Sequence, residues 1–555
     1  MTTCLLYVAV LAAGSVTAEG IAAEPTVFES SSELSPQGRI DELVLSRLQQ
    51  LGLQPARICS DGVFVRRVFL DVIGTLPTAQ EAREFLQDQD PDKRRTLIDR
   101  LLLRGEFADY WAMKWSDLLR VKAEFPINLW PNAAQAYHRW IHTSIQQNRP
   151  YDQFVRDLLT ANGSNFRVGQ VNFYRAVQDK TPQGLAQAVA LTFLGARADK
   201  WPPDRLAGMA AFFSQISYTP TGEWKEEIVS FNPATPGTEE PPASAIFPDG
   251  TPVKLQPDED PRVVFADWLI RAENPWFARP VVNRAWCWLL GRGIIHEPDD
   301  IRPDNAPSNP ELLAFLEQEF IASKYDLRHL YRLILNSQTY QLSSVARSDK
   351  PEAAANFAYY PLRRLDAEVL IDAVNQITGT SEEYSSAVPE PFTYMPEGQR
   401  AVALPDGSIT SPFLEMFGRP ARDTGLESER SNRPTADQRL HLLNSSHIQR
   451  KIENSPKLQA LLAPTSAGRP AGFNKAKQAR RYRYLGIAQD PRGSGDAQST
   501  ETAVTSLYLT FLSRFPTQTE LTQVTEYAKS ASSAREALTD VVWALLNSAE
   551  FLYRH

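Results

Sequence analysis

The densest group of side chains that could do chemistry lies in the segment FGRPARDTGLESER, residues 417–430. Arginine binds carboxylates and other anions through paired hydrogen bonds, so arginines and acids in one segment form either a buried ion network or an anion-binding cleft. The sequence leaves both interpretations open. The charged side chains concerned are Arg419, Arg422, Asp423, Glu427, Glu429 and Arg430.

A second candidate group lies upstream of that segment. Asp299 and Asp300 are adjacent, and neighbouring carboxylates can hold a cation or transfer protons, although Asp-rich loops more often cap the next helix. Arg284 belongs to NPWFARPVVNRAWCWLLGRG, whose aromatic and guanidinium groups suit a sugar ring or a peptide. In the same segment, helical spacing predicts a core-facing stripe made of Val281, Ala285, Trp288 and Leu289.

The motifs of well-known catalytic and cofactor sites are absent from the sequence. It has no P-loop, no dinucleotide-binding glycine fingerprint, no nucleophile elbow and no zincin helix. His138 and His142 are spaced to share a metal on one helix face, but no third ligand is evident. We therefore expect no metal, no haem and no other cofactor. Catalytic residues stay unknown, and the candidate binding residues are Arg284, Asp300, Arg419, Arg422, Glu427, Glu429 and Arg430.

The elements that must position these side chains are mainly helices. Apolar residues recur at helical spacing, and strand-like alternation is scarce. Thr78 with Glu81, Thr517 with Glu520 and Ser533 with Glu536 each have the spacing of a capping box. We therefore predict a mainly α fold with few or short strands.

A proline-rich stretch divides the chain. Residues 233–261 hold eight prolines, cannot form a helix, and indicate a connector between two helical domains, residues 37–232 and 262–555. Within the second domain, residues 464–500 are rich in Gly, Ser and Ala and predict an irregular loop.

The two ends of the chain resemble each other. LDVIGTLPTAQE near the start matches LTFLSRFPTQTE near the end, and each is followed by an apolar helix that finishes in Glu-Phe. Pro-Thr-x-x-Glu is also good capping chemistry that can arise twice independently. The second Glu-Phe match favours duplication of a helical unit.

The N-terminus indicates export. Residues 1–18 contain an apolar stretch too short to span a bilayer and end in Val16-Thr17-Ala18, which suits signal-peptide cleavage, although the first three residues carry no Lys or Arg. Cleavage leaves a flexible start, residues 19–36, and no membrane span. We expect the mature protein in the periplasm or at the cell surface, where Cys59 and Cys287 either pair or remain as two buried thiols.

Composition limits the partners. A net charge of −8, with 43% hydrophobic and 22% charged residues, is typical of a soluble globular protein and gives no reason to expect a nucleic-acid partner. An extracellular glycan or another exported protein remains a candidate, and composition says nothing of the oligomeric state.

The same segments also carry a family resemblance. RVFLDVIGTLPTAQEAREFLQD and NRPYDQFVRDLLTANG resemble the first domain of a secreted planctomycete-type family with paired domains of unknown function, associated with cytochrome c domains. LRRLDAEVLIDAV, GQRAVALPDG and DVVWALLNSAEFLYRH are similar to its second domain. The resemblance implies export and a helical build, and it supplies no reaction.

The departures from that family pattern concern cysteines. Where relatives typically carry Cys-x-x-Cys-His, the segment after Gly195 is ARADKWPPD, and where they often carry Cys-Glu-Cys, this chain has Leu426-Glu427-Ser428. A covalent haem needs two thiols and a histidine, so none can form there. We hypothesise that the two cysteine motifs of relatives form one site, which this chain has lost.

Two functions follow from these features. The favoured one is a non-catalytic exported binding or scaffold component. The alternative is an extracytoplasmic hydrolase that acts on a polysaccharide or another polymer through carboxylates such as Asp300, Glu427 or Glu429.

Overall fold

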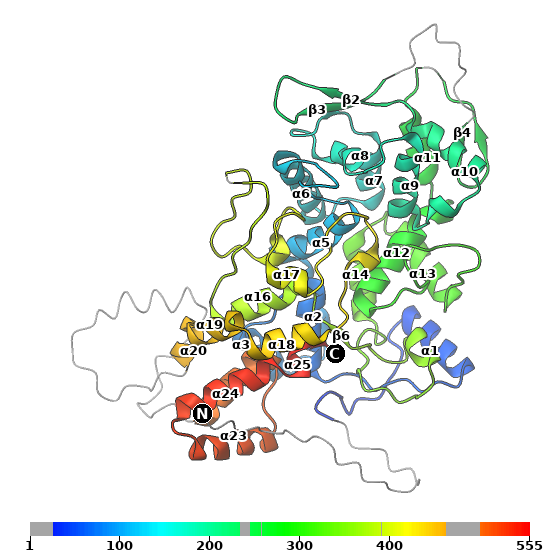
Figure 1. The fold of residues 1–555 in the computed structure, drawn as a ribbon. Helices are drawn as coiled ribbons and strands as arrows, with labels where there is room; N and C mark the ends of the chain where they lie inside the picture. Colours follow the sequence, from blue (N-terminus) through cyan, green and yellow to red (C-terminus); the bar gives the residue numbers. More distant parts are fainter. Residues whose placement is uncertain (1–25, 233–244, 257, 390, 462–499) are drawn as a thin grey trace.

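The computed structural model describes residues 26–232, 245–256, 258–389, 391–461 and 500–555 (Figure 1). The predicted signal peptide, the irregular loop up to residue 499 and residues 233–244 of the proline-rich connector lie outside this part of the chain. The structure is 54% helical and 5% strand, which confirms the mainly α prediction.

The helices before the connector include α5, whose tryptophans pack against a helix that follows the connector. The aromatic cluster of Trp111 and Trp115 on α5 packs against Trp288 of a later helix, with ring centroids 5.5 and 5.9 Å apart. The bounds are α1 (Arg39–Gln50), α2 (Asp61–Val72), α3 (Ala79–Gln87), α4 (Lys93–Leu102), α5 (Gly105–Leu118), α6 (Pro131–Gln146), α7 (Tyr151–Thr160), α8 (Asn172–Arg175), α9 (Pro182–Val189) and α10 (Pro203–Ala210).

The helices after the connector include α12, whose predicted core stripe is confirmed: Val281, Ala285 and Leu289 are fully buried and Trp288 is nearly so. The bounds are α11 (Pro261–Leu269), α12 (Pro275–Leu290), α13 (Pro310–Ala322), α14 (Leu327–Asn336), α15 (Glu352–Ala355), α16 (Ala367–Thr378), α17 (Pro412–Met416), α18 (Ala436–Asn444), α19 (Ser446–Glu453), α20 (Pro456–Leu461), α22 (Thr500–Leu512), α23 (Gln518–Ser530), α24 (Ala534–Leu546) and α25 (Ala549–Leu552).

The strands of the described residues are short and antiparallel. They form a three-stranded sheet in the order β1-β3-β2 and two two-stranded pairs, β4 with β5 and β6 with β7. The last pair ties the chain end to the second half of the molecule, because Arg363 faces Arg554. The bounds are β1 (Gly163–Ser164), β2 (Ile216–Pro220), β3 (Glu227–Phe231), β4 (Ala245–Ile246), β5 (Pro252–Val253), β6 (Arg363–Arg364) and β7 (Tyr553–Arg554).

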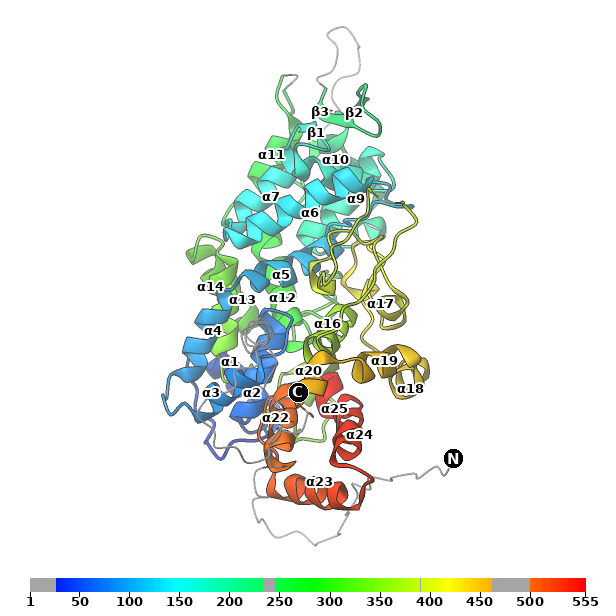
Figure 2. The same ribbon diagram turned by 90° about the vertical axis from the view of Figure 1, so that its left-hand side faces the viewer.

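The parts of the chain before and after the connector pack closely against each other. Helix α1 contacts α13, α4 contacts α14, and α12 contacts the π-helical turn Ala190–Leu194 at the end of α9. In Figure 2, α5 passes between the upper helices α6 and α7 and the lower helices α2 to α4, beside α12 and α16. The division into two domains stays a prediction.

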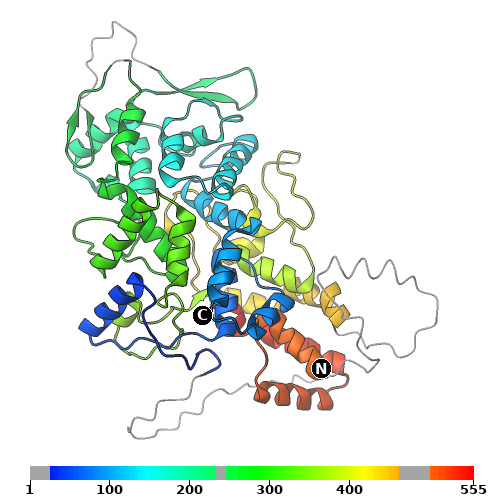
Figure 3. The same cartoon turned by 180° about the vertical axis from the view of Figure 1, so that it is seen from behind.

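The first and last helical units lie side by side. Helix α22 contacts α3, and Arg66 of α2 donates hydrogen bonds to the carbonyl oxygens of Phe511 and Phe551, each at 2.7 Å. Figure 3 shows the blue N-terminal helices against the orange and red C-terminal ones. The beginning and the end of the chain therefore share one packed region.

These two units have the same local structure. Thr78 and Thr517 each form the predicted capping box, whereas Ser533 accepts a hydrogen bond from the Glu536 backbone without a reciprocal one. Gly74 and Ser513, which occupy matching positions, both adopt a left-handed backbone, with φ of 60° and 58°. Because a serine rarely adopts this conformation, the shared geometry supports the predicted duplication.

Candidate functional site

Three of the candidate arginines meet two acids that the sequence did not single out. The Arg430 guanidinium lies 2.7 Å from a carboxylate oxygen of Asp117 on α5 and 2.6 Å from one of Glu368 on α16. Arg422 donates to Asp117 at 2.9 Å, and Arg419 lies 3.4 Å from Glu368. The irregular segment 417–430 is thereby held between the end of α5 and the first turn of α16.

This cluster extends to the end of the chain through Asp366, which precedes α16. Its carboxylate lies 3.1 Å from both Lys114 and Arg554. Burial alone would raise the pKa of Asp366, but Lys114, Arg554 and Arg430 outweigh it and hold that pKa well below its ordinary value. We name the buried ion network as Lys114, Asp117, Asp366, Glu368, Arg419, Arg422, Arg430 and Arg554.

A second buried ion pair lies beside the network. Arg284 is fully buried, pairs with Asp299 at 2.8 Å, and donates to the Leu191 carbonyl oxygen at 2.6 Å. Asp299 also accepts a hydrogen bond from the Glu427 backbone at 2.6 Å. The expectation that Asp299 caps the next helix is therefore wrong: its carboxylate is held by Arg284 instead, and the following helix is capped by Asn309.

The three acids named for the hydrolase alternative occupy different environments. Asp300 pairs at 3.2 Å with Arg302, whose side chain is 50% exposed. Glu427 accepts a hydrogen bond from Trp288 at 2.9 Å, and burial raises its pKa. Glu429 accepts bonds from the backbone of Asp423 and Thr424, within its own loop. These contacts resemble structural ion pairs and loop supports, and a binding role for the candidate residues stays a prediction.

The turn after Gly195 lies close to this region. Gly195 has a left-handed backbone, with φ of 61°, and its carbonyl oxygen accepts a hydrogen bond from Ile301, two residues after Asp299. Glu427 is thus linked to the π-helical turn through Asp299 and Arg284. These contacts support the hypothesis of one shared site in relatives, which stays a prediction.

The two cysteines and the pair His138 and His142 form no joint site within the described residues. Cys59 and Cys287 are both free thiols, so they do not pair with each other. His142 shares a hydrogen bond with Asp109 at 3.0 Å. Within the ranges that the structure describes, no group of three or more His, Cys, Asp or Glu side chains could hold a metal ion, and no helix is long and apolar enough to cross a membrane.

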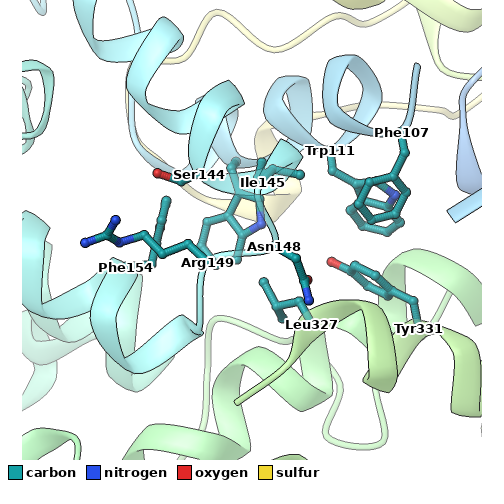
Figure 4. A pocket seen from close by; sticks show the side chains of 10 residues that line it. Phe107, Trp111, Ser144, Ile145, Asn148, Arg149, Phe154, Leu327 and Tyr331 are labelled. Atoms are coloured by element: carbon teal, nitrogen blue, oxygen red, sulfur yellow. The ribbon is translucent and has the colours of Figure 1, made fainter. Parts of the chain in front are cut away.

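The cavity nearest the aromatic core is too small for a ligand. It measures about 20 Å³ and lies between α5, α7 and α14, where the rings of Trp111 and Tyr331 stack with centroids 4.1 Å apart (Figure 4). A volume of this size holds about one water molecule. This region is therefore core.

A larger cavity of about 340 Å³ is polar and lies between the segments before and after the connector. One wall comes from the starts of α3 and α5, and the other from α16 and the loop that follows it. Hydroxyl and amide groups alternate there with charged ones. We name it the polar cavity; its charged residues are Glu81, Arg104, Glu106, Asp372 and Arg400.

The charges of the polar cavity are unequally matched. Arg104 pairs closely with Glu81 and Glu106, at 2.9 and 2.5 Å, and this contact lowers the pKa of Glu106. Arg400 has looser partners: it donates to the Gly74 carbonyl oxygen at 3.5 Å and approaches Asp109 and Asp372 only to 3.7 Å. Its guanidinium can therefore take a closer hydrogen-bond acceptor from a ligand.

Asp372 is the acid with the most perturbed environment in this cavity. Burial raises its pKa to about 6, although Arg400 and the backbone of Ala401 and Val402 act in the opposite direction. Both carboxylate oxygens accept backbone hydrogen bonds, at 2.7 and 3.1 Å. Perturbed acids gather at functional sites more often than elsewhere, so this cavity is a candidate site.

The sequence did not point to the charged residues of the polar cavity as a site, because they come from distant segments of the chain. Asp372 lies in LRRLDAEVLIDAV and Arg400 in GQRAVALPDG, two segments that carried the family resemblance, but neither has the spacing of a catalytic motif. Glu81 attracted attention only as a capping residue, a role it does fill. Only the packing of α3 and α5 near α16 brings them to one cavity.

The fold and the site together define a helical protein whose irregular segment 417–430 is held by buried ion pairs, with a polar cavity between the segments before and after the connector. PSCyt2, described as a protein of unknown function (DUF1549), matches residues 39–216, and PSD1, described as a protein of unknown function (DUF1553), matches residues 261–528. The chain belongs to the family with these planctomycete cytochrome c-associated paired domains, in that order. No curated protein and no solved structure matches the chain.

Proposed function

We propose that this protein is an exported, non-catalytic binding protein that takes a polyhydroxylated ligand, such as a fragment of an extracellular glycan, in the polar cavity. The observation that carries the proposal is Arg400, which faces the cavity with no carboxylate nearer than 3.7 Å. A cavity of about 340 Å³ also lies within the usual size range of small-ligand sites.

The lining chemistry supports a neutral rather than a strongly charged ligand. Three acids, Glu81, Glu106 and Asp372, are nearly balanced by Arg104 and Arg400. Hydroxyl and amide side chains, including Thr75, Thr380 and Gln399, supply donors and acceptors between them. A sugar, which carries hydroxyl groups on all sides, suits this alternation of polar groups.

Binding is tested with a glycan array on the mature protein, followed by calorimetric titration of each hit. We expect Arg400→Ala to weaken binding by about tenfold or more, because the loss of one hydrogen bond to a charged group costs about 1.5–3 kcal/mol. Arg302→Ala removes an arginine that is 50% exposed outside this cavity and serves as the matched control. Equal affinity of the wild type and Arg400→Ala for every hit would contradict the proposal.

A hydrolase that acts on the same ligand is the second candidate. The observation in its favour is that the pKa of Asp372 is raised to about 6 while that of Glu106 is lowered, as expected of an acid and a base. Turnover of an array hit, lost in Asp372→Asn while binding is retained, would establish this function. If the wild type turns over none of the glycans that it binds, the hydrolase is rejected and the binding function is retained.

Export is tested on the protein itself. Cleavage after Ala18 makes Glu19 the first residue of the mature protein. N-terminal sequencing of protein recovered from the periplasm or the cell surface checks this expectation.

A further inference from the structure

A second cavity, larger than the polar cavity, is apolar and lies beside the end of the chain. It measures about 640 Å³ and is bounded by α18, the β6–β7 pair, α25 and the chain terminus. This volume lies within the range of small-ligand sites, and it belongs neither to the polar cavity nor to the buried ion network.

The walls of this cavity include apolar side chains that water reaches. Leu362 and Leu443 are 59% and 54% exposed, and Phe417 and Leu442 line the interior. Exposing large aliphatic groups beside a hollow costs free energy, about 25 cal/mol for each Å² of apolar surface, which an apolar ligand would recover. The shape and lining therefore fit an aliphatic chain.

A buried arginine lies in the same wall. Arg364 is 4% exposed and donates from one guanidinium nitrogen to the carbonyl oxygens of Phe417 and Ser431, at 2.6 and 3.0 Å. Its other two side-chain nitrogens are buried without a hydrogen-bond partner, and Arg364 is the one residue in the described part of the chain with two such atoms; its guanidinium also lies over the Phe417 ring, 5.3 Å from the centroid. Arg364 forms no ion pair with any described residue, and burial lowers its pKa although Asp366 and Glu368 act in the opposite direction.

The acid that lines this cavity already has an arginine partner. Glu550 pairs with Arg514 at 2.6 Å, and the same arginine pairs with Glu520 at 2.8 Å. By contrast, Arg439 lines the cavity, is exposed, and forms no ion pair with any residue that the structure describes. The cavity therefore combines an apolar lining with an excess of positive charge, and a buried charge of this kind favours an anionic group nearby.

We propose that this cavity binds an amphiphilic carboxylate of the long-chain fatty acid type. The carboxylate pairs with the exposed Arg439 at the mouth and is attracted at longer range by the buried charge of Arg364, and the aliphatic chain lies along Leu362, Phe417 and Leu443. A fatty acid satisfies both features of the cavity, since one end is anionic and the remainder is apolar.

The first test compares dodecanoate with dodecanol by calorimetric titration of the full mature protein. We expect dodecanoate to bind with one-to-one stoichiometry and dodecanol to bind at least about tenfold more weakly, because it lacks the charge that Arg364 and Arg439 attract. Equal affinity for the two probes, or no binding of dodecanoate, would overturn the proposal.

Variants separate the two parts of the site. Leu443→Asp places a charge at the exposed mouth and should abolish dodecanoate binding, whereas Leu103→Asp, at a leucine that is 71% exposed and does not line this cavity, should leave it unchanged. Arg364→Met should weaken dodecanoate binding about tenfold and leave dodecanol binding unaltered. If Arg364→Met does not fold, Arg439→Ala measures the contribution of positive charge at an exposed position. Unchanged dodecanoate affinity in both Arg439→Ala and Leu443→Asp would overturn the proposal.

A vesicle experiment distinguishes a free fatty acid from a membrane. We expect no co-sedimentation with vesicles of phosphatidylcholine and phosphatidylglycerol under conditions where dodecanoate binds. Co-sedimentation without binding of free dodecanoate would assign this surface to a membrane and reject the fatty-acid site. Loss of glycan binding in Arg400→Ala has no bearing on this result, because Arg400 lines the other cavity.

Discussion

At the scale of single residues, the arginines of segment 417–430 show how charged side chains can serve as structural partners of neighbouring helices. Arg419, Arg422 and Arg430 each contact an acid on α5 or α16, and these contacts fix an irregular segment between two helices. Buried ion pairs add little net stability when complete, but removing one partner leaves an uncompensated charge that is costly. The network therefore makes the position of segment 417–430 specific.

The first prediction concerns Arg430. Arg430→Ala leaves Asp117 and Glu368 without their closest guanidinium partner, and we expect the free energy of unfolding to fall by about 3–5 kcal/mol. Arg302→Ala, at an exposed ion pair, should cost less than about 1 kcal/mol. Urea unfolding followed by circular dichroism checks both values, and similar losses in the two variants would contradict the network's role.

The second prediction concerns the pH dependence of stability at Asp372. Its pKa is about 6 in the folded protein and 3.8 ordinarily, so the folded state keeps a proton that the unfolded state has released between these values. This contribution to stability is present below about pH 4 and is lost as the pH rises through about 6.

We therefore compare the wild type with Asp372→Asn across this window. The free energy of unfolding of the wild type should fall by about 2–3 kcal/mol relative to the variant between pH 4 and pH 7. The carboxylates whose pKa is lowered, such as Asp366, change stability in the opposite direction in both proteins and cancel in the difference. Parallel stability profiles would show that Asp372 is not buried as described.

At the scale of elements, the two related helical units place different residues at the same backbone position. A Cβ at Gly74 would lie 2.5 Å from the ring of Tyr110, so only glycine fits there. Ser513 adopts the same left-handed conformation with a buried hydroxyl that has no hydrogen-bond partner. Substitutions at the two positions should therefore change the free energy of unfolding in opposite directions.

The third prediction follows from this difference. Ser513→Gly removes backbone strain and an unpaired hydroxyl, and we expect a gain of about 1 kcal/mol in the free energy of unfolding. Gly74→Ala adds strain and a contact with Tyr110, and we expect a loss of about 2 kcal/mol or more. Thermal unfolding of both variants measures the signs, and destabilisation by Ser513→Gly would argue against equivalent local structures.

The helices themselves were largely predictable from local sequence. Thr78 and Thr517 begin α3 and α23 as their capping chemistry predicts, and the apolar stripe of α12 is buried. The polar cavity was not predictable, because Glu106 and Asp372 are separated by hundreds of residues and neither has a motif around it. Local preferences act over a few residues, whereas a cavity depends on how distant helices pack.

At the scale of the whole molecule, the contacts cross the division that the proline-rich connector predicts. Asp41 of α1 accepts hydrogen bonds from the backbone and hydroxyl of Thr339, and Arg67 of α2 holds the terminal residue His555. The network likewise joins α5 to Arg554, at the far end of the chain. The segments before and after the connector therefore contribute to each other's stability.

The fourth prediction is that both segments unfold together. Differential scanning calorimetry of the mature protein should show one transition, and residues 39–216 produced alone should not reach a stable fold, because the packing surfaces of α1 and α4 would be exposed. A fragment with a cooperative transition of its own, or two resolved transitions in the whole protein, would establish two independent domains.

The sequence by itself determined the helical class, the helix starts and the relationship between the two ends of the chain, because periodicity and capping depend on neighbouring residues. It also showed that the turn after Gly195 lacks the cysteines that a covalent haem requires there. The tertiary structure alone decided that Arg419, Arg422 and Arg430 belong to a buried network, and that Asp372, Arg400 and Arg364 line cavities. Whether a charged side chain is a structural partner or a ligand-binding group depends on what packs against it, and those partners come from distant parts of the chain.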